Sequence, residues 1–218
     1  ITGATSGIGK ATAETFAKQG HRLIICGRRK EVLDALQIQL SNLTEVYSLV
    51  FDVRNQQEVQ NAINSLPEEW KNIDVLINNA GNAHGLEPIS EANISDWDAM
   101  MDGNVKGLLY VSQPIIKIMK ARNSGHIVNI SSVAARQTYA NGTVYCASKK
   151  AVDVISEGMR LELTEFGIKV TNIQPGAVET DFSKIRFKGD EQRAATVYAG
   201  YEPLIAEDIA DAISYCVN

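Results

Sequence analysis

The sequence contains few cysteines, few histidines and no long apolar run. Its three cysteines, Cys26, Cys146 and Cys216, are an odd number without Cys-x-x-Cys spacing, which favours a reducing, cytoplasmic environment over a disulfide framework. The three histidines are scattered without the spacing of metal ligands, so we expect no metal site. No stretch approaches the roughly 20 apolar residues of a membrane span, and nothing resembles a signal peptide, so we expect no membrane partner.

Positive charge is also scarce. The 218 residues carry 21 Lys and Arg against 26 Asp and Glu, for a formal net charge of -5. This balance argues against nucleic acid or an acidic membrane surface as the main partner. The apolar fraction of 44% is ordinary for a soluble globular protein, and the chain is long enough to bury a sizeable core.

Short β-branched runs alternate with amphipathic segments along most of the chain. The expected strands cover residues 22–26, 46–51, 74–78, 126–131 and 169–174, and the expected helices cover residues 8–19, 31–40, 56–65, 96–119 and 144–166. This alternation predicts an α/β fold, with one domain over residues 1–218 built on a parallel sheet that has helices on both faces. The chain opens without the apolar strand expected before a glycine-rich turn, and it stops within a helical pattern. We therefore expect part of the first strand and the C-terminal end to be missing.

The glycine-rich stretch stands where a first strand would turn into the first helix. Such a turn presents unpaired backbone N–H groups and the positive end of a helix dipole to an anion, and its glycines let a pyrophosphate approach. The spacing Gly-x-x-x-Gly-x-Gly differs from the common dinucleotide fingerprint, and a P-loop is excluded because Ala11 follows Gly9-Lys10. A purely structural turn is the alternative. The predicted cofactor residues here are Gly3, Thr5, Ser6, Gly7, Ile8 and Gly9.

Two arginines follow the second expected strand. A dinucleotide site usually has an acid there to hold the ribose hydroxyls, but this sequence reads Cys26-Gly27-Arg28-Arg29. Arginine binds phosphate bidentately and an acid would repel it, so Arg28 and Arg29 predict a 2'-phosphate site and NADP rather than NAD as the cofactor. The alternative is a solvated basic start of a helix.

Tyr145 and Lys149 lie four residues apart in a helical pattern and therefore project from one face. Lowering the tyrosine pKa from about 10 by two to three units requires roughly 3 to 4 kcal/mol. One unit charge at about 4 Å, with an effective dielectric constant near 20, supplies about 4 kcal/mol. The pair thus predicts a phenol that acts as a base, and the alternative is a helix surface with a solvated lysine.

Taken in order, the motifs resemble the short-chain dehydrogenase/reductase superfamily over essentially the whole chain. They are Thr2-Gly-x-x-x-Gly-Ile-Gly9, Asp52-Val53, Asn78-Asn79-Ala80-Gly81, Asn104, Ser132, Tyr145-x-x-x-Lys149 and Pro175-Gly176. The resemblance implies a Rossmann-type doubly wound sheet, an enzyme that oxidises CH–OH groups or reduces carbonyls with NADP, a small-molecule substrate and a homotetramer. A subunit interface is also favoured by residues 107–119, because a helix that is apolar on nearly every side needs cover on more than one face.

The resemblance also implies a role for each matching residue. Tyr145 would exchange a proton with the substrate hydroxyl, while Lys149 would lower its pKa and hold the cofactor ribose. Ser132 would hold the substrate oxygen, with Ser131 as the alternative hydroxyl. Asn104 would complete a proton relay to Lys149, unless it is only a polar group that bends a helix. The remaining predicted cofactor contacts are Asp52 and Val53 at the adenine, Asn79, Ala80 and Gly81 along the cofactor, and Pro175, Gly176, Val178 and Thr180 at the nicotinamide.

The substrate is expected to be covered by residues 181–190, where basic and aromatic residues mix. These residues, with Phe51-Asp52-Val53-Arg54-Asn55 and Leu66-Pro67-x-x-Trp70, resemble the branch of NADP-dependent 3-hydroxy acid (serine or allo-threonine) dehydrogenases and malonic semialdehyde reductases. The resemblance implies interconversion of a short 3-hydroxy acid and its oxo or semialdehyde form. Arg186 is the hypothetical carboxylate clamp, and a solvated arginine is the alternative. Other possible functions are a carbonyl reductase for a larger ketone and a non-catalytic NADP-sensing protein.

Overall fold

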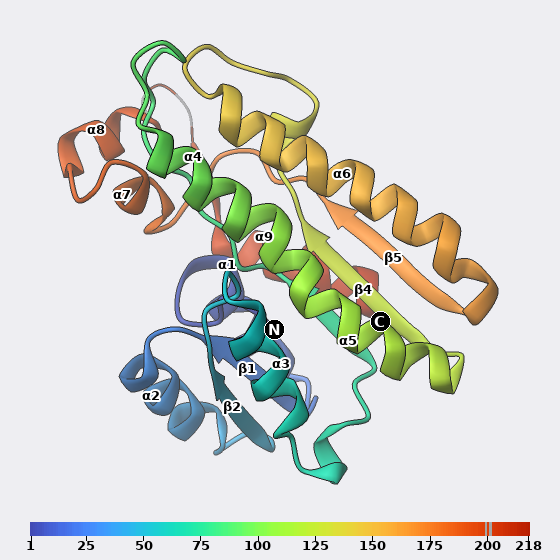
Figure 1. Cartoon of the computed structure of the whole chain (residues 1–218). Helices are drawn as coiled ribbons and strands as arrows, with labels where there is room; N and C mark the ends of the chain where they lie inside the picture. The colour runs from blue at the N-terminus through green and yellow to red at the C-terminus, as the bar shows by residue number, and fades with distance from the viewer. Residues whose placement is uncertain (199, 201) are drawn as a thin grey trace.

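The fold is organised around a parallel sheet joined at its centre by the first residues of the chain (Figure 1). The computed structural model describes residues 1–198, 200 and 202–218. In one part of the sheet β1 (Leu23–Gly27) pairs with β2 (Val46–Val50), and in the other the order is β3 (Val75–Asn78), β4 (Gly125–Ile130) and β5 (Ile168–Ile173).

Residues 1–4 lie between β1 and β3 and connect these two parts. The Cys26 N–H donates to the Ile1 carbonyl oxygen at 2.9 Å, and the Thr2 N–H donates to the Ile77 carbonyl oxygen at 3.0 Å. Thr2 also forms a parallel bridge with Cys26. The strand order reverses direction across this segment, as in a doubly wound sheet, so the predicted fold class is confirmed.

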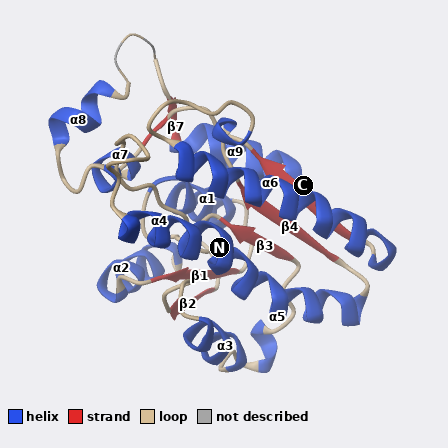
Figure 2. Ribbon diagram, turned by 45° about the horizontal axis from the view of Figure 1, so that its top comes forward, coloured by secondary structure: helices blue, strands red, loops and turns tan. Residues whose placement is uncertain are grey.

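Helices cover both faces of the sheet (Figures 1 and 2). On one face α3 (Gln56–Asn64), α5 (Gly107–Arg122) and α6 (Thr143–Leu163) pack into one apolar cluster. On the other face α1 (Gly7–Lys18), α2 (Lys30–Leu40) and α9 (Ala206–Val217) pack into a second cluster. The five expected strands and the helices 8–19, 31–40, 56–65 and 144–166 therefore lie where they were predicted, with ends that differ by up to three residues.

The expected continuous helix over residues 96–119 is wrong. The structure divides it into α4 (Ile94–Met101), a π-helical turn (Asp102–Lys106) and α5. The π turn contains the buried Asn104, whose side chain bonds to groups outside the helix. A π turn of this kind is often found at a functional site because it turns a side chain away from the regular helical position.

A buried set of polar side chains ties the strands to the helices in the middle of the molecule. Asn78 of β3 stands opposite Asn129 of β4, and its Nδ2 donates to the Asn129 Oδ1 and to the Ser112 Oγ, both at 2.9 Å. The Asn129 Nδ2 in turn donates to the Ser156 Oγ at 2.9 Å. All four side chains are buried, and each bonds to another member of the set.

The segment after β5 forms a small separate layer next to α4 (Figure 2). It contains α7 (Phe182–Arg186) and α8 (Glu191–Thr196), and β6 (Val178–Glu179) pairs with β7 (Leu204–Ile205) at its base. Short 3-10 turns occupy Glu68–Trp70, Val133–Ala135 and Thr164–Phe166. Among the described residues, no helix is both long enough and apolar enough to cross a membrane.

Candidate active site

A cleft of about 420 Å³ opens at the carboxyl ends of the parallel strands. Ligands of open α/β sheets bind at this edge, where the strand order reverses. Most of the predicted site residues line the cleft, and the exceptions are Gly9, Asn104 and Arg186. Those that line it are Gly3, Thr5, Ser6, Gly7, Ile8, Arg28, Arg29, Asp52, Val53, Asn79, Ala80, Gly81, Ser132, Tyr145, Lys149, Pro175, Gly176, Val178 and Thr180.

The glycine-rich turn forms the floor of the cleft. Gly3 has a φ angle of +67°, and a Cβ there would lie 2.9 Å from the Asn79 Nδ2. That amide donates to the carbonyl oxygens of Thr2 at 2.9 Å and Gly3 at 3.2 Å, which holds the turn against the loop after β3. Gly9 is buried, and a Cβ there would collide with the Gly3 carbonyl oxygen. Gly9 therefore serves close packing of the turn and does not face the cleft.

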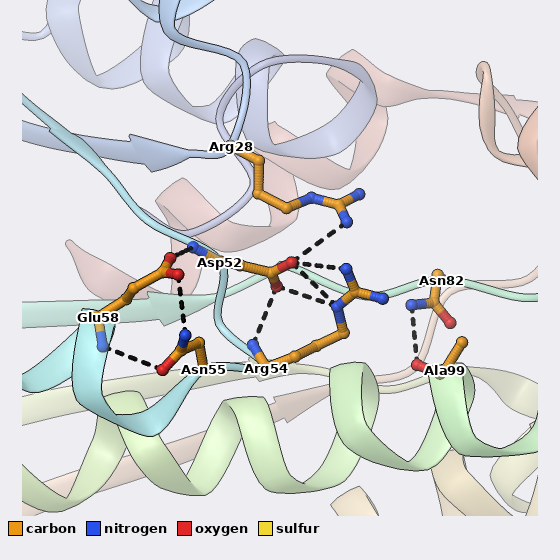
Figure 3. Close-up of polar contacts among 7 residues, drawn as sticks. All are labelled: Arg28, Asp52, Arg54, Asn55, Glu58, Asn82 and Ala99. Atoms are coloured by element: carbon orange, nitrogen blue, oxygen red, sulfur yellow. Dashed lines mark hydrogen bonds and ion pairs between the residues drawn. The ribbon is translucent and has the colours of Figure 1, made fainter.

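The two arginines after β1 differ in what they contact. The Arg29 Nη2 donates to the Thr5 carbonyl oxygen at 3.0 Å and to the Thr5 Oγ1 at 2.9 Å, so it braces the glycine-rich turn. The Arg28 Nη1 lies 3.5 Å from the Asp52 Oδ2. A third arginine, Arg54, which was not among the predicted site residues, contacts the same carboxylate oxygen, with its Nη2 2.6 Å from the Oδ2 (Figure 3).

The loop that carries Asp52 is fixed by the start of α3 (Figure 3). The Asn55 Oδ1 accepts hydrogen bonds from the Gln57 and Glu58 N–H groups, as an N-cap does. The Glu58 Oε2 accepts a hydrogen bond from the Asp52 N–H at 3.0 Å. Burial alone would raise the pKa of Asp52, but the hydrogen bonds and charge of Arg54 outweigh it and hold that pKa below its ordinary value.

Tyr145 and Lys149 face the opposite end of the cleft and are both buried. The Lys149 Nζ donates to the Ile130 carbonyl oxygen at 3.0 Å and lies 5.9 Å from the centroid of the Tyr145 ring. Burial raises the pKa of Tyr145 to about 12. Burial lowers the pKa of Lys149 to about 8. The expectation that Lys149 lowers the phenol pKa stays a prediction, because burial dominates the pKa in this geometry and the smaller lowering contributions come from Ser132 and Arg186.

Ser131 and Ser132 point to different partners. The Ser131 hydroxyl donates to the Lys149 carbonyl oxygen at 2.8 Å, which fixes it to the backbone of α6. The Ser132 Oγ accepts from the Ala134 N–H at 3.1 Å, and its hydroxyl lies close enough to the Tyr145 side chain to favour a lower pKa of the phenol. The structure thus brings Ser132, and not Ser131, to the phenol.

Asn104 lies behind the cleft wall. Its Oδ1 accepts from the Asn82 N–H at 2.7 Å, and its Nδ2 donates to the Asn82 carbonyl oxygen at 2.8 Å and to the Ser148 Oγ at 3.0 Å. A Cβ built on Gly81 would lie 3.1 Å from the Asn104 Oδ1 and 3.4 Å from the Lys149 Nζ. The amide and the ammonium therefore share the space above Gly81.

Arg186 is buried, so the alternative of a solvated arginine is wrong. Its Nε donates to the Gly85 carbonyl oxygen at 2.9 Å, and its Nη1 donates to the Tyr139 hydroxyl at 3.0 Å. The guanidinium carbon lies 5.7 Å from the centroid of the Tyr145 ring, and both residues line a second, smaller cavity beside the cleft. Arg186 is thus a cation next to the phenol.

Sequence reasoning missed part of the cleft wall. It also missed the contacts that hold the lid, the segment of residues 181–196 that contains α7 and α8. Phe182 packs edge-on against Tyr145 with the ring centroids 5.8 Å apart. Ion pairs join the lid to α4 and to the loop before it: Lys188 pairs with Asp96 of α4 at 3.0 Å, and Arg193 pairs with Glu87 of the loop at 3.4 Å. Of the missed wall residues, Arg54 and Phe182 belong to stretches already noted in the sequence. The missed wall residues are Cys26, Gly27, Phe51, Arg54, Asn82, Gly103, Ile130, Asp181, Phe182 and Ile185.

Comparison with known proteins identifies the family of the chain. Residues 1–191 match the short chain dehydrogenase family. The NADP-dependent 3-hydroxy acid dehydrogenase YdfG of Salmonella typhi is 44% identical over 214 residues, which cover 98% of this chain and 86% of that protein. The NADP-dependent 3-hydroxy acid dehydrogenase of Schizosaccharomyces pombe is 40% identical over 221 residues, which cover 100% of this chain and 85% of that protein.

A solved structure, the closed form of serine dehydrogenase complexed with NADP+, superimposes with a TM-score of 0.94 at 42% identity. The match covers 99% of this chain and 86% of the other. Together with the family match, this similarity confirms the predicted membership, and the chain belongs to the short chain dehydrogenase family.

Proposed function

We propose that this protein is an NADP-dependent oxidoreductase that interconverts a short 3-hydroxy acid and its oxo or semialdehyde form. The observation that carries the proposal is the buried Arg186 guanidinium 5.7 Å from the ring of Tyr145. A hydroxyl held at the phenol then has a cation within reach for a carboxylate. The proposal agrees with the relatives, which are named as 3-hydroxy acid dehydrogenases and as a serine dehydrogenase.

The cleft suits NADP along its whole length. The start of α1 offers backbone N–H groups to a pyrophosphate, and Arg28 stands where a 2'-phosphate would lie. Asp52 and Val53 line the adenosine end, and the loops after β3 and β5 line the remainder. When bound, the nicotinamide supplies the hydride acceptor in oxidation and the hydride donor in reduction.

Residues of the chain would carry out the proton transfer. In reduction Tyr145 would give its proton to the substrate oxygen. In oxidation the phenol, whose pKa burial raises to about 12, would take the proton of the substrate hydroxyl while it passes its own proton on toward Lys149. Ser132 holds the reacting oxygen by hydrogen bonding. Lys149 has a pKa of about 8, so its ammonium can release and regain a proton near neutral pH. Asn104 and Lys149 share the space above Gly81, where a water molecule would complete the relay.

Arg186 would make the enzyme prefer substrates that carry a carboxylate. In a 3-hydroxy acid the hydroxyl oxygen and the carboxylate carbon are roughly 4 Å apart when ordinary bond lengths are extended. A molecule of this length held at the Tyr145 hydroxyl would bring its carboxylate toward the guanidinium, whose carbon lies 5.7 Å from the ring centroid. The carboxylate would have to compete with the Tyr139 hydroxyl, which now accepts from the Arg186 Nη1.

Steady-state assays of the purified protein would test the proposal. Serine, 3-hydroxypropanoate and 3-hydroxyisobutyrate would each be offered with NADP and with NAD, beside a panel of larger neutral ketones with NADPH. We expect the largest kcat/KM for a 3-hydroxy acid with NADP. A preference for a neutral ketone would favour the carbonyl reductase, and no turnover of any compound would favour the NADP-sensing protein.

We also propose a cytoplasmic homotetramer in which each chain is one NADP-binding domain over residues 1–218. The helices α5 and α6 expose large apolar side chains, among them Leu109, Val154 and Leu161, the last at 79%. Such residues on neighbouring helices are typical of a surface covered by another subunit. Light scattering after gel filtration should give four times the chain mass of 23.8 kDa.

A further inference from the structure

The adenosine end of the cleft contains a carboxylate 3.5 Å from Arg28, the residue proposed to bind the 2'-phosphate. Asp52 lines the cleft between Arg28 and Arg54 (Figure 3). A phosphate monoester carries a charge of about -1.5 to -2 at neutral pH. A charged Asp52 would therefore repel the 2'-phosphate of NADP unless another group neutralised it. The inference developed from this conflict rests on the proposed NADP dependence.

Arg54 is directed at Asp52 and holds both of its carboxylate oxygens. The Arg54 Nε donates to the Oδ1 at 3.1 Å and to the Oδ2 at 3.0 Å, and the Nη2 donates to the Oδ2 at 2.6 Å. The Arg54 N–H also donates to the Oδ1 at 3.0 Å, which closes a tight turn over residues 52–54. This is the bidentate geometry in which arginine binds a carboxylate most strongly.

The other two arginines are engaged differently. Arg28 has one ion-pair contact with Asp52, at 3.5 Å, and 63% of its side chain is exposed. Arg29 is directed at Thr5 and braces the glycine-rich turn. Arg28 is thus the cation with most freedom to turn toward a ligand, provided that Asp52 is neutralised by another partner.

We propose that Arg54 is a positioning residue for NADP selectivity, which neutralises Asp52 so that Arg28 can give its charge to the 2'-phosphate. Arg54 acts through the carboxylate and not through contact with the phosphate. Removing Arg54 therefore exposes an uncompensated negative charge beside the ligand. If the charge of Asp52 is removed at the same time, Arg54 is no longer required for binding of the 2'-phosphate.

Isothermal titration of the whole chain with two adenosine ligands tests this independently of catalysis. Adenosine 2',5'-bisphosphate carries the 2'-phosphate, and adenosine 5'-monophosphate lacks it. We expect Arg54→Met to weaken binding of the bisphosphate by about tenfold, a change of roughly 1.4 kcal/mol, and to leave the monophosphate nearly unchanged. The double variant Asp52→Asn/Arg54→Met should regain most of the lost affinity.

Arg22→Met is a matched control. Arg22 forms an ion pair with Glu45 at 2.9 Å, and its side chain is about as exposed as that of Arg54, 48% against 40%. It does not line the cleft. This variant should bind both ligands like the parent protein.

Three results would overturn the inference. Equal weakening of both ligands by Arg54→Met would show a general structural role. A double variant that stays as weak as Arg54→Met would show that Arg54 contacts the phosphate directly. The third result would be that the parent protein binds the bisphosphate no better than the monophosphate. In that case the proposed NADP dependence fails as well, whereas the first two results would leave it intact.

Discussion

The two ends of the cleft use their cations in opposite ways. At the adenosine end, Arg28 and Arg54 are largely exposed and share a carboxylate. At the catalytic end, Lys149 is 6% exposed and Arg186 is 9% exposed, and the hydrogen bonds they donate end on carbonyl and hydroxyl oxygens. Exposed ion pairs contribute little stability and are screened by salt, whereas a buried cation keeps a strong field. The adenosine end is therefore built to select an anion, and the catalytic end to balance charge that changes during reaction.

The strongest test of the catalytic end is Tyr145→Phe, which removes one hydroxyl and keeps the ring against Phe182. We expect kcat to fall by about 10² to 10⁴, the usual contribution of a general acid or base. Binding of NADPH, followed by fluorescence, should change little because the adenosine end is intact. Retained turnover would show that another group moves the proton.

The next largest effect should come from Lys149→Met, measured as stability. The lysine pKa is about 8 in the folded chain against an ordinary 10.5, so its burial costs about 3 kcal/mol below pH 8. Between pH 8 and 10.5 the unfolded chain binds more protons, and the stability of the parent protein rises with pH.

The variant should therefore be more stable than the parent by about 2 to 3 kcal/mol at pH 7, since the lost hydrogen bond to Ile130 offsets part of the gain. Urea unfolding at several pH values would measure the difference, which should shrink as pH approaches 10.5. A difference that is constant across this range would refute the assigned pKa.

A smaller effect is expected from Arg186→Met. Loss of a charge-assisted bond to the substrate carboxylate should reduce kcat/KM for a 3-hydroxy acid by about 10- to 100-fold, because such bonds contribute roughly 1.5 to 3 kcal/mol. A neutral secondary alcohol of similar size, assayed in parallel, should lose much less. Equal losses for both substrates would mean that Arg186 only holds the lid to Gly85 and Tyr139.

The smallest expected effect is that of salt concentration, which should weaken binding at the adenosine end of the cleft and leave catalysis at the other end nearly unchanged. Raising ionic strength from about 0.05 to 0.5 M shortens the screening length from roughly 14 to 4 Å and should weaken binding of adenosine 2',5'-bisphosphate several-fold. The kcat measured at saturating NADP should stay nearly constant, because Lys149 and Arg186 are buried. A parallel fall in kcat would contradict the contrast between the two ends.

Most of the fold could be predicted from the sequence because it depends on local patterns. Alternating β-branched runs and amphipathic segments placed the five strands of the sheet, and the glycine spacing placed the turn at the cleft. The break at Asn104 was foreseen only as the alternative of a polar group that bends a helix, because its partners Asn82 and Ser148 come from distant segments. The helical period of the surrounding residues continues through the break.

The pKa values and contacts of the site residues were less predictable, because they depend on burial. The charge arithmetic for Tyr145 and Lys149 left out the cost of removing both groups from water, which dominates the pKa of each. Arg186 lies in a stretch whose composition suits a solvated loop, and only the contacts with Gly85 and Tyr139 show that it is buried. Arg54 stands in a stretch noted in the sequence, but its pairing with Asp52 was missed because nothing in the sequence shows that the arginine side chain folds back onto the carboxylate.

The buried asparagines of β3 and β4 have a consequence for how the chain finds its fold. Asn78 and Asn129 meet only when the two strands are aligned as observed, and a slip of one strand by one residue would put the two amides on opposite faces of the sheet. Every amide or hydroxyl left without a partner in the interior costs about 1 to 3 kcal/mol. The buried polar side chains that bond to Asn78 and Asn129 thus favour the observed register of β3 and β4 over a shifted one. Loops at the carboxyl ends of the strands, including those that choose the substrate, are then free to change without misaligning the strands that carry them.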